Sequence, residues 1–261
     1  MAAGATYLDR ILERHRAAAS DDARSTDRLV EEAAGMPPAR GFAAALRAAP
    51  ALGVIAEIKR RSPSKGDLNA GLDPGELAAT YERGGAACLS VLTDAEHFGG
   101  SPDDLRGARA ACAVPVLRKD FTVAANDVVD ARLMGADCVL LIAAALDPVE
   151  LADFHRLAIE IGLDVLVEIH DERELEHALA AEATLIGVNQ RDLVTFEVDH
   201  ERAARMAGVI PDHAVKVAES GVRGGTDAAA LHAAGYDAVL VGETLVTAAD
   251  PAAVIAELRG T

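Results

Sequence analysis

Lysine and the aromatic residues are scarce in this chain. Tryptophan is absent, aromatic side chains make up 3% of the residues, and only four of the 25 basic residues are lysine: Lys59, Lys65, Lys119 and Lys216. With a net charge of −17, the chain has no general excess of basic groups. This excludes the broad basic face that a nucleic acid or an anionic membrane surface requires. A chain this acidic that binds an anionic molecule needs a locally positive site.

Long apolar segments are also missing. No apolar run approaches the roughly 18 to 20 residues that span a bilayer. The N-terminus, MAAGATYLDRILERHR, carries charges where a signal peptide has its apolar segment. We therefore expect no membrane partner and a cytoplasmic protein.

Cysteine and histidine patterns give no sign of disulfides or metals. The three cysteines, Cys88, Cys112 and Cys138, are odd in number, and two of them lie in apolar runs. They are predicted to be reduced core residues. The eight histidines show no HxxxH spacing and no pairing with cysteine at ligand spacing, so we predict no metal site and no cofactor.

Eight short apolar runs recur along the chain, with helical patterns between them. Such runs are typical of strands in a parallel sheet that is covered on both faces. Eight βα units favour a closed (β/α)8 TIM barrel of the α/β class. An open doubly wound sheet usually has fewer strands and a GxGxxG motif after the first, which is missing here. The predicted strands are 54–58, 87–92, 114–118, 137–143, 164–169, 184–189, 214–219 and 237–242.

Cap residues repeat with the strands. A glycine stands where a helix would end, two residues before a strand, at Gly85, Gly135 and Gly235. An N-cap residue precedes proline at four predicted helix starts: Asp73-Pro74, Ser101-Pro102, Asp147-Pro148 and Asp250-Pro251.

The first 50 residues precede the first strand and show helical apolar stripes, for example Tyr7, Leu8, Ile11 and Leu12. We predict a helical extension over 1–50 packed on a barrel over 51–261, the two forming one structural domain. The favoured interpretation is that the extension closes one end of the barrel. The alternative is that it covers the active-site end.

Ionisable and amide side chains end several predicted strands. In a barrel of this kind the active site lies at the C-terminal ends of the strands. Strand period two also places Glu57 and Lys59 on the same side. The ionisable, amide and hydroxyl residues that end strands 1, 3, 5, 6 and 7 at this rim are Glu57, Lys59, Arg118, Lys119, Asp120, Glu168, His170, Asn189, Gln190, Arg191, Glu219 and Ser220.

The scarcity of lysine bears on this rim. A lone Glu-x-Lys pair is usually a structural ion pair, and a lone lysine is usually solvated. Lysine can nevertheless lose its proton when desolvated, whereas arginine in practice cannot, so a general acid is a reason to keep lysine. We therefore interpret Lys59 and Lys119 as functional, and Lys216 as a structural ion-pair partner.

Three loops at the same rim have the composition of binding segments. Residues 60–72 form a long loop that is either a lid or a solvated charge run. Gly-rich turns follow strands 7 and 8, the usual phosphate site of this fold. Phe98 and Phe121 either form an apolar wall or anchor loops. Basic residues at strand ends or in following loops would supply the positive site: Lys59, Arg60, Arg61, Lys65, Arg118, Lys119, Arg191 and Arg223.

These segments resemble one family over nearly the whole chain. VIAEIKRRSPSKG (54–66), SVLTDAEHFGGS, VPVLRKDF, VEIHDERELE, IGVNQRDLVTFEVD, VAESGV and DAVLVGETLV are similar to indole-3-glycerol phosphate synthase, in its order and spacing. The resemblance implies a carbon–carbon lyase of tryptophan biosynthesis. Its substrate would be 1-(2-carboxyphenylamino)-1-deoxyribulose 5-phosphate, closed to indole-3-glycerol phosphate with loss of carbon dioxide and water.

The resemblance also implies roles by position. Lys119 would be the general acid for ring closure, and Glu168 the acid or base of the dehydration. Lys59 would be a second lysine near the substrate carboxylate and phosphate. The other implied catalytic residues are Glu57, Asn189, Glu219 and Ser220. Ser62, Phe98, Phe121 and Arg191 would contact substrate, and the phosphate would lie at Lys59, Ser220, Gly221, Gly242 and Glu243.

Three other functions are less compatible with these residues. A phosphoribosylanthranilate isomerase would use a Cys-and-Asp pair, whereas strand 1 carries Glu57 and Lys59. A Schiff-base aldolase would place its lysine on strand 6, where this chain has Asn189. A barrel that binds phosphometabolites without turnover predicts loss of a proton-transfer residue. We expect a small phosphorylated aromatic substrate, no nucleic-acid partner, and a monomer or weak homodimer.

Overall fold

The computed structural model describes residues 6–260. Eight of its strands form the barrel: β1 (Gly53–Ile58), β4 (Cys88–Leu92), β5 (Val116–Lys119), β6 (Cys138–Ile142), β7 (Asp164–Ile169), β8 (Leu185–Asn189), β9 (Val215–Glu219) and β10 (Ala238–Val241). A short hairpin is made by β2 (Arg61–Ser62) and β3 (Gly66–Asp67).

Helices precede, connect and follow the strands. They are α1 (Tyr7–Ser20), α2 (Thr26–Ala33), α3 (Phe42–Arg47), α4 (Pro74–Arg83), α5 (Ala95–Phe98), α6 (Pro102–Ala111), α7 (Ala125–Met134), η1 (Ala143–Ala145), α8 (Pro148–Glu160), α9 (Glu172–Ala180), α10 (Arg202–Ala207), α11 (Gly225–Ala233), α12 (Glu243–Val246) and α13 (Pro251–Arg259). Among the described residues, no helix has both the length and the apolar character that a bilayer crossing demands.

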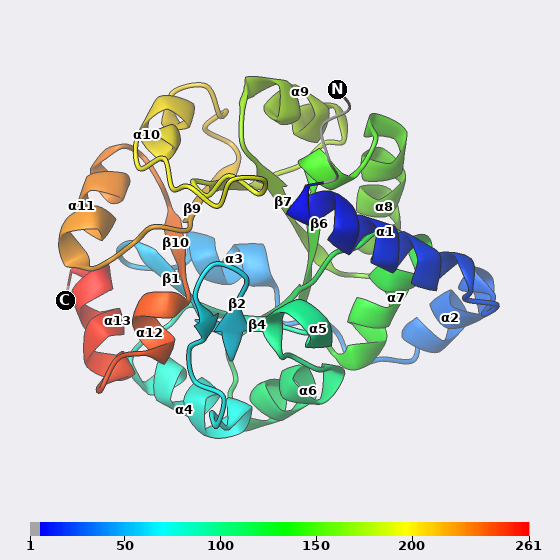
Figure 1. Cartoon of the computed structure of the whole chain (residues 1–261), viewed down its shortest axis with the longest axis horizontal. Coiled ribbons are helices and arrows are strands. Elements are labelled where there is room, and N and C mark those ends of the chain that lie inside the picture. The colour runs from blue at the N-terminus through cyan, green and yellow to red at the C-terminus, as the bar shows by residue number, and fades with distance from the viewer. Residues whose placement is uncertain (1–5, 261) are drawn as a thin grey trace.

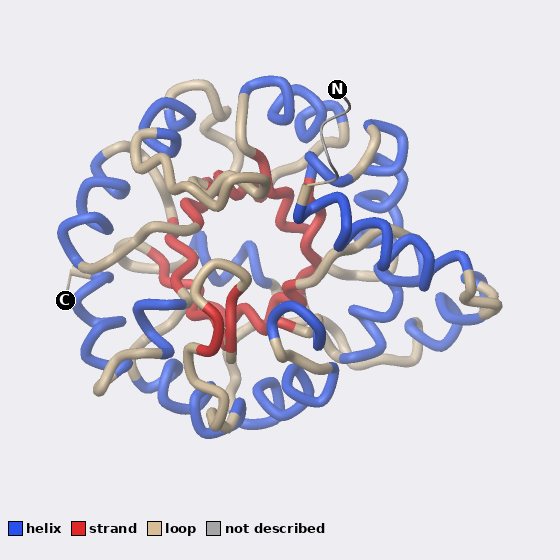
Figure 2. The backbone as a smooth tube through the Cα atoms, in the orientation of Figure 1, coloured by secondary structure: helices blue, strands red, loops and turns tan. Residues whose placement is uncertain are grey.

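The strands close into a parallel barrel in the order β1-β10-β9-β8-β7-β6-β5-β4, with β4 pairing back onto β1. Figure 2 shows the strands as a ring surrounded by helices. The predicted (β/α)8 barrel is confirmed, and each predicted strand is present within two residues of its expected ends.

Strand period two decides which side chains reach the inside of the barrel. An inner apolar cluster contains Ile55, Leu117, Leu166 and Val217. Two residues further along each of these strands stands an ionisable residue, so the same inward direction places at the carboxyl end Glu57, Lys119, Glu168 and Glu219. A separate apolar layer, which includes Val54, Val91 and Val167, packs the outer faces of the strands against the helices.

The helices before β1 reach both ends of the barrel. Phe42 and Leu46 of α3 are buried in the inner cluster with strand residues, so α3 closes the amino end. Helix α1 instead contacts segments that follow β4 and β6, through Arg14 to Asp94 and Arg16 to the Ala145 carbonyl. Figure 1 shows α1 in the foreground and α3 behind the opening. Helix α3 thus closes one end of the barrel, and α1 lies at the active-site end. The division of the extension from the barrel at residue 50 stays a prediction.

The predicted cap residues occupy their expected places. Asp73, Ser101, Asp147 and Asp250 each accept a backbone hydrogen bond at the first turn of a helix that begins with proline. Gly85, Gly135 and Gly235 have φ of 87°, 92° and 101°, a region that favours glycine because it has no Cβ. The three cysteines are buried and free, as predicted.

Candidate active site

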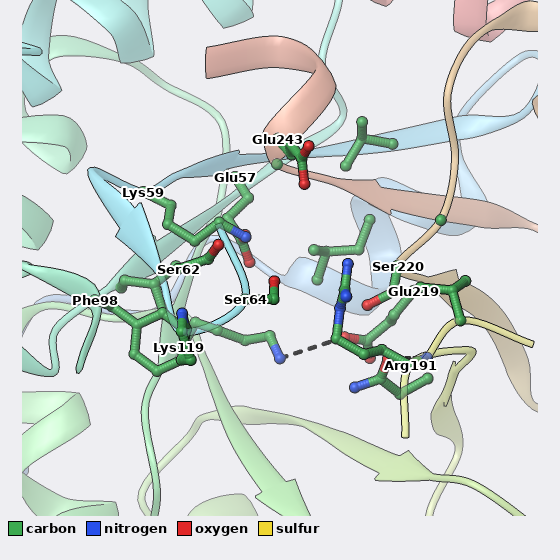
Figure 3. Close-up of a pocket in the computed structure, with 18 of the residues that line it drawn as sticks. Glu57, Lys59, Ser62, Ser64, Phe98, Lys119, Arg191, Glu219, Ser220 and Glu243 are labelled. Carbon is green, nitrogen blue, oxygen red and sulfur yellow. Dashed lines mark hydrogen bonds and ion pairs between the residues drawn. The ribbon is translucent and has the colours of Figure 1, made fainter. Parts of the chain in front are cut away.

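A cavity of about 450 Å³ opens at the carboxyl ends of the strands. All fourteen site residues predicted from the sequence line it. Figure 3 shows Lys59, Lys119 and Glu219 among the side chains that surround this space. The residues come from strands far apart in the sequence, and the barrel brings them together: Glu57, Lys59, Ser62, Phe98, Lys119, Phe121, Glu168, Asn189, Arg191, Glu219, Ser220, Gly221, Gly242 and Glu243.

Lys119 lies between two buried carboxyl groups. Its Nζ donates to Glu168 Oε2 at 2.8 Å and lies 3.4 Å from Glu219 Oε2. The Glu168 and Glu219 side chains are 1% and 2% exposed. Glu219 Oε1 is buried with no hydrogen-bond partner among the described residues. One ammonium thus faces two carboxyl groups, one of which has a free oxygen.

The surroundings shift the proton affinities of the two acids in opposite directions. Burial raises the pKa of Glu219, and the charges of Glu168 and Glu57 add to this against the opposing effect of Lys119. Burial also disfavours ionisation of Glu168, but Lys119 and His170 outweigh it and lower its pKa. For Lys119, burial opposes charge, yet the neighbouring acidic groups, Glu168 first among them, raise its pKa. Near neutral pH we therefore assign a charged Lys119, an ionised Glu168 and a protonated Glu219.

A second ion pair lies at the end of β1. Lys59 Nζ is 2.6 Å from Glu57 Oε1, which confirms that the two side chains share a side. Both lie against Gly242, where a Cβ would overlap Glu57 Oε1. The absence of a side chain at residue 242 therefore makes room for this pair.

Asn189 connects two parts of the site. Its Nδ2 donates to Glu168 Oε1 at 2.9 Å, and its Oδ1 accepts from the Arg191 backbone N–H at 3.0 Å. The Arg191 side chain donates to the Phe196 carbonyl at 3.0 Å. Asn189 is thereby held between the end of β7 and the loop after β8.

The turn after β9 has an unusual backbone. Ser220 has φ 64° and Gly221 φ 76°, so two successive residues are left-handed. This conformation costs a serine on the order of 1 kcal/mol or more and persists only where the surroundings enforce it. Gln190 Nε2 donates to the Ser220 carbonyl at 2.8 Å and holds the turn beside the cavity.

The loop after β1 lies over the cavity. The sequence predicts a long loop over residues 60–72, and the structure contains the β2–β3 hairpin within it. Ser62 Oγ is buried without a hydrogen-bond partner in the described part of the chain. Lys65 reaches Glu243 of α12 at 3.5 Å. The loop after β1 is therefore in contact with the segment that follows the neighbouring strand, β10.

Phe98 and Phe121 form one aromatic wall. Their ring centroids are 6.4 Å apart, and both rings line the cavity. The rings therefore lie close enough to present one apolar surface to a ligand.

The predicted basic set divides into two groups. Five of its members line the cavity: Lys59, Lys65, Lys119, Arg191 and Arg223. Arg60 and Arg118 instead pair with Asp104 and Asp120, and Arg61 donates to backbone carbonyls of α5. Acidic side chains also line the cavity, so the expectation of a locally positive site is only partly met. Lys216 contacts the Ala207 carbonyl and Asp212, away from the cavity, as its structural interpretation predicts.

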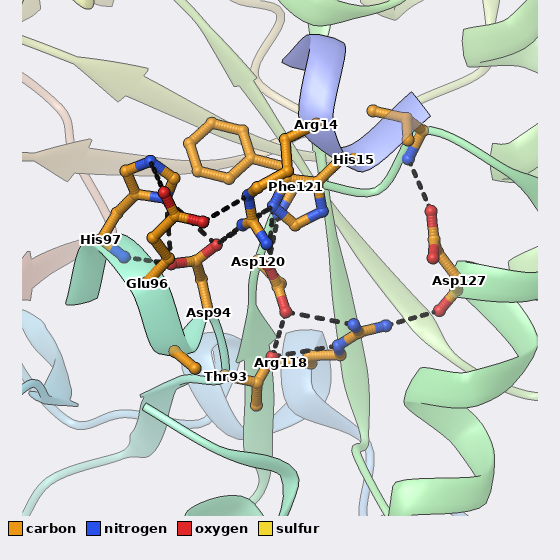
Figure 4. Close-up of polar contacts among 12 residues, drawn as sticks. Arg14, His15, Thr93, Asp94, Glu96, His97, Arg118, Asp120, Phe121 and Asp127 are labelled. Atoms are coloured by element: carbon orange, nitrogen blue, oxygen red, sulfur yellow. Dashed lines mark hydrogen bonds and ion pairs between the residues drawn. The ribbon is translucent and has the colours of Figure 1, made fainter. Parts of the chain in front are cut away.

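A polar cluster fixes α1 to the loops beside the aromatic wall (Figure 4). Arg14 pairs with Asp94, His15 Nε2 lies 3.1 Å from Asp94 Oδ2, and the His15 ring is 5.5 Å from that of Phe121. His15, Asp94 and Asp120 have atoms close enough to hold a metal ion. Arg14 already supplies a positive charge to Asp94, however, and Asp120 accepts from Arg118 and Thr93. The absence of a metal site therefore remains a prediction.

Sequence reasoning missed Gly187 of β8. A Cβ there would overlap Glu219 Oε1, so glycine leaves the space that this carboxyl group fills. The only signal available was the glycine inside an apolar strand, which suggests a close approach by another group.

A family model described as indole-3-glycerol phosphate synthase matches residues 8–258. The chain belongs to this family. Indole-3-glycerol phosphate synthase 2 of Streptomyces coelicolor is 54% identical over 237 residues, which cover 91% of this chain and 92% of that protein. Indole-3-glycerol phosphate synthase of Mycolicibacterium smegmatis is 50% identical over 256 residues, covering 97% and 94%. The predictions of the family and of an enzyme of the indole-3-glycerol phosphate synthase class are confirmed.

Solved structures outside the family share the fold. Thiamine phosphate pyrophosphorylase from Pyrococcus furiosus superposes with a TM-score of 0.60 at 16% identity, over 80% of this chain and 94% of that one. N-acetylmannosamine-6-phosphate 2-epimerase from Clostridium perfringens gives 0.58 at 12% identity, over 74% and 86%. At such identities the likeness concerns the barrel alone.

Proposed function

We propose that this chain converts 1-(2-carboxyphenylamino)-1-deoxyribulose 5-phosphate to indole-3-glycerol phosphate, carbon dioxide and water. The family assignment supports the reaction. The observation that carries the residue roles is the contact of Lys119 with both Glu168 and Glu219 inside the cavity. The partner is then a small phosphorylated aromatic substrate, with no added cofactor. We expect a monomer or weak homodimer acting in the cytoplasm.

Ring closure needs an acid. The ring carbon that bears the carboxylate forms a bond to the C2′ carbonyl carbon, and the carbonyl oxygen takes up a proton. Lys119 supplies that proton, since its charged form is stabilised by the neighbouring carboxylates. The carboxylate then leaves as carbon dioxide, and the electron pair of the broken bond restores the aromatic ring.

Dehydration needs an acid and a base together. The new hydroxyl leaves as water after it is protonated, and C1′ loses a proton as the indole double bond forms. We assign the base to Glu168, because its lowered pKa keeps it ionised despite burial. The acid is a lysine of the pair Lys59 and Lys119, and Asn189 holds Glu168 in place.

The remaining lining residues would bind the substrate. We propose that Phe98 and Phe121 contact its aromatic ring, while Ser62 and Arg191 contact polar groups. The turns after β9 and β10 offer backbone N–H groups to the phosphate, with Lys59 adding charge. The phosphate-binding residues are Lys59, Ser220, Gly221, Gly242 and Glu243.

The absence of tryptophan gives a direct test. Because the protein contains no indole of its own, product indole fluorescence would grow against a dark background. Purified protein mixed with 1-(2-carboxyphenylamino)-1-deoxyribulose 5-phosphate, without added metal or cofactor, should show this rise together with carbon dioxide release. No signal at micromolar enzyme would contradict the proposal.

A further inference from the structure

His170 lies close to Glu168 Oε1, whereas Lys119 contacts the other carboxylate oxygen, Oε2. His170 follows β7, and its ring Nδ1 is 3.0 Å from Glu174 Oε2 of α9. The backbone N–H of His170 donates to the same oxygen at 2.7 Å. Its Nε2 is buried, has no hydrogen-bond partner in the described part of the chain, and lies 4.0 Å from Glu168 Oε1. One nitrogen is therefore fixed by Glu174 while the other faces the Glu168 carboxylate.

The charges around this ring favour its protonated form. Burial opposes protonation of His170, but the hydrogen bond with Glu174 and the charges of Glu168 and Glu174 together raise its pKa. Arg202 of α10 opposes them. The side chains that share the shallow cavity outside His170 are Asp171, Glu172, Arg173, Arg202, Arg205 and Met206. The two glutamates closest to the ring carry the negative charge that an imidazolium needs.

We propose that His170 is a positioning residue for Glu168, fixed by Glu174 and presenting a charged N–H to Oε1 of the Glu168 carboxylate. Glu168 Oε2 then faces Lys119, and Oε1 faces Asn189 and His170. A movement of about 1 Å would bring Nε2 to hydrogen-bond distance of Oε1. This inference rests on the proposed role of Glu168, whose ionised form it maintains until the carboxylate takes the C1′ proton.

A purely local role for His170 would leave one nitrogen unexplained. The backbone N–H and Nδ1 both contact Glu174, which on its own would fasten the start of α9 to the end of β7. Such a role does not require Nε2 to be buried facing Glu168, because an exposed nitrogen would be solvated at no cost. The two explanations differ in whether the charge of Glu168 affects the pKa of His170. Such an effect is reciprocal: if the Glu168 carboxylate favours the imidazolium, the imidazolium favours the carboxylate to the same extent.

The decisive experiment follows the titration of His170 by NMR in protein with labelled histidine. The signal is assigned as the one missing from His170→Gln among the eight histidines. We expect a pKa above the ordinary 6.5 in the parent protein and a fall of roughly 1 unit or more in Glu168→Gln. Glu176→Gln, a change at an exposed position of α9, the helix that carries Glu174, should leave the His170 pKa unchanged. An unchanged His170 pKa in Glu168→Gln would overturn the proposal.

Kinetics give a second, independent measurement. His170→Gln keeps a neutral N–H donor but removes the positive charge, so the pKa of Glu168 should rise. In a plot of kcat against pH, the acidic limb should therefore move to higher pH by roughly 1 to 3 units. KM should change little, and the exposed His213→Gln should behave like the parent. An unshifted limb in a folded His170→Gln protein would also overturn the proposal. If Glu168→Gln retained full turnover while the NMR coupling was present, the proposed function of Glu168 would fail, but the contact would stand.

Discussion

Lys119 Nζ lies 2.8 Å from Glu168 Oε2, although the two residues are 49 positions apart in the sequence. The two side chains project inward from β5 and β7, which are separated by β6 in the barrel. The charge on Lys119 favours the ionised form of Glu168, and the carboxylate in turn favours the ammonium. A charged acid and an ionised base are thus present in one buried site, which is the requirement of a reaction with successive proton transfers.

The two carboxyl groups beside Lys119 should respond differently to amide replacement. Glu168→Gln removes the proposed base and should lower kcat by roughly 100-fold to 10,000-fold. Glu219→Gln replaces a group whose raised pKa keeps it protonated, so it should retain much more activity at pH 7. Steady-state kinetics of both variants, with circular dichroism to check folding, test this difference.

The pH profiles extend the same prediction. A group with a raised pKa loses its proton as the pH rises through that value, which would place a second negative charge beside Lys119. Turnover of the parent protein should therefore fall on the alkaline side, and this limb should be absent in Glu219→Gln. Equal losses in Glu168→Gln and Glu219→Gln at neutral pH would contradict the assignment of protonation states.

Gly187 should be required for the position of Glu219. In Gly187→Ala the new Cβ would overlap Glu219 Oε1, so the carboxyl group must move away from Lys119. We expect kcat to fall by about tenfold or more, since small displacements of reacting groups are costly. Gly208→Ala is the matched control because, in the described part of the chain, its added Cβ would meet no group from another segment within 4 Å. If both variants kept parental kcat, Gly187 would not serve this role.

Phe42 should contribute to stability rather than to chemistry. It is fully buried at the closed end of the barrel, in the inner cluster with strand residues. Phe42→Ala should lower the free energy of unfolding by about 3 to 5 kcal/mol, from lost burial and the resulting cavity. Urea unfolding measures this change. Activity per folded molecule should stay near that of the parent, and a specific loss of kcat would show that α3 also affects the site.

The barrel and its inward-facing residues could be predicted from the sequence because both depend on how apolar residues repeat within short segments. Glu57 and Lys59 share a side through strand alternation alone, and Lys119 stands at a strand end where this fold places its active site. Neither statement needs knowledge of which strand lies opposite. Position at a strand end likewise predicted Glu168, Asn189, Glu219 and Ser220, whereas the resemblance to the family supplied Ser62 and the roles of the individual residues.

Contacts between distant segments could not be predicted in this way. Arg14 meets Asp94 across 80 positions, and Lys119 of β5 contacts Glu168 of β7. The pairing of Arg118 with Asp120 is local in sequence, but the contact of the Arg118 side chain with Thr93, which follows β4, depends on the pairing of β4 with β5. Contacts of this kind depend on how the segments pack in three dimensions, and the period of apolar residues along the chain carries no information about that packing.

The central claim is that Lys119 supplies the proton for ring closure, and one comparison tests it most directly. Lys119→Met and Lys216→Met each remove a buried ammonium, but the Lys216 ammonium contacts the Ala207 carbonyl and Asp212, away from the cavity. With turnover followed by indole fluorescence, Lys119→Met should lose roughly 100-fold to 10,000-fold in kcat while remaining folded. Lys216→Met should lose stability but keep its turnover. Near-parental turnover in a folded Lys119→Met protein would contradict the account.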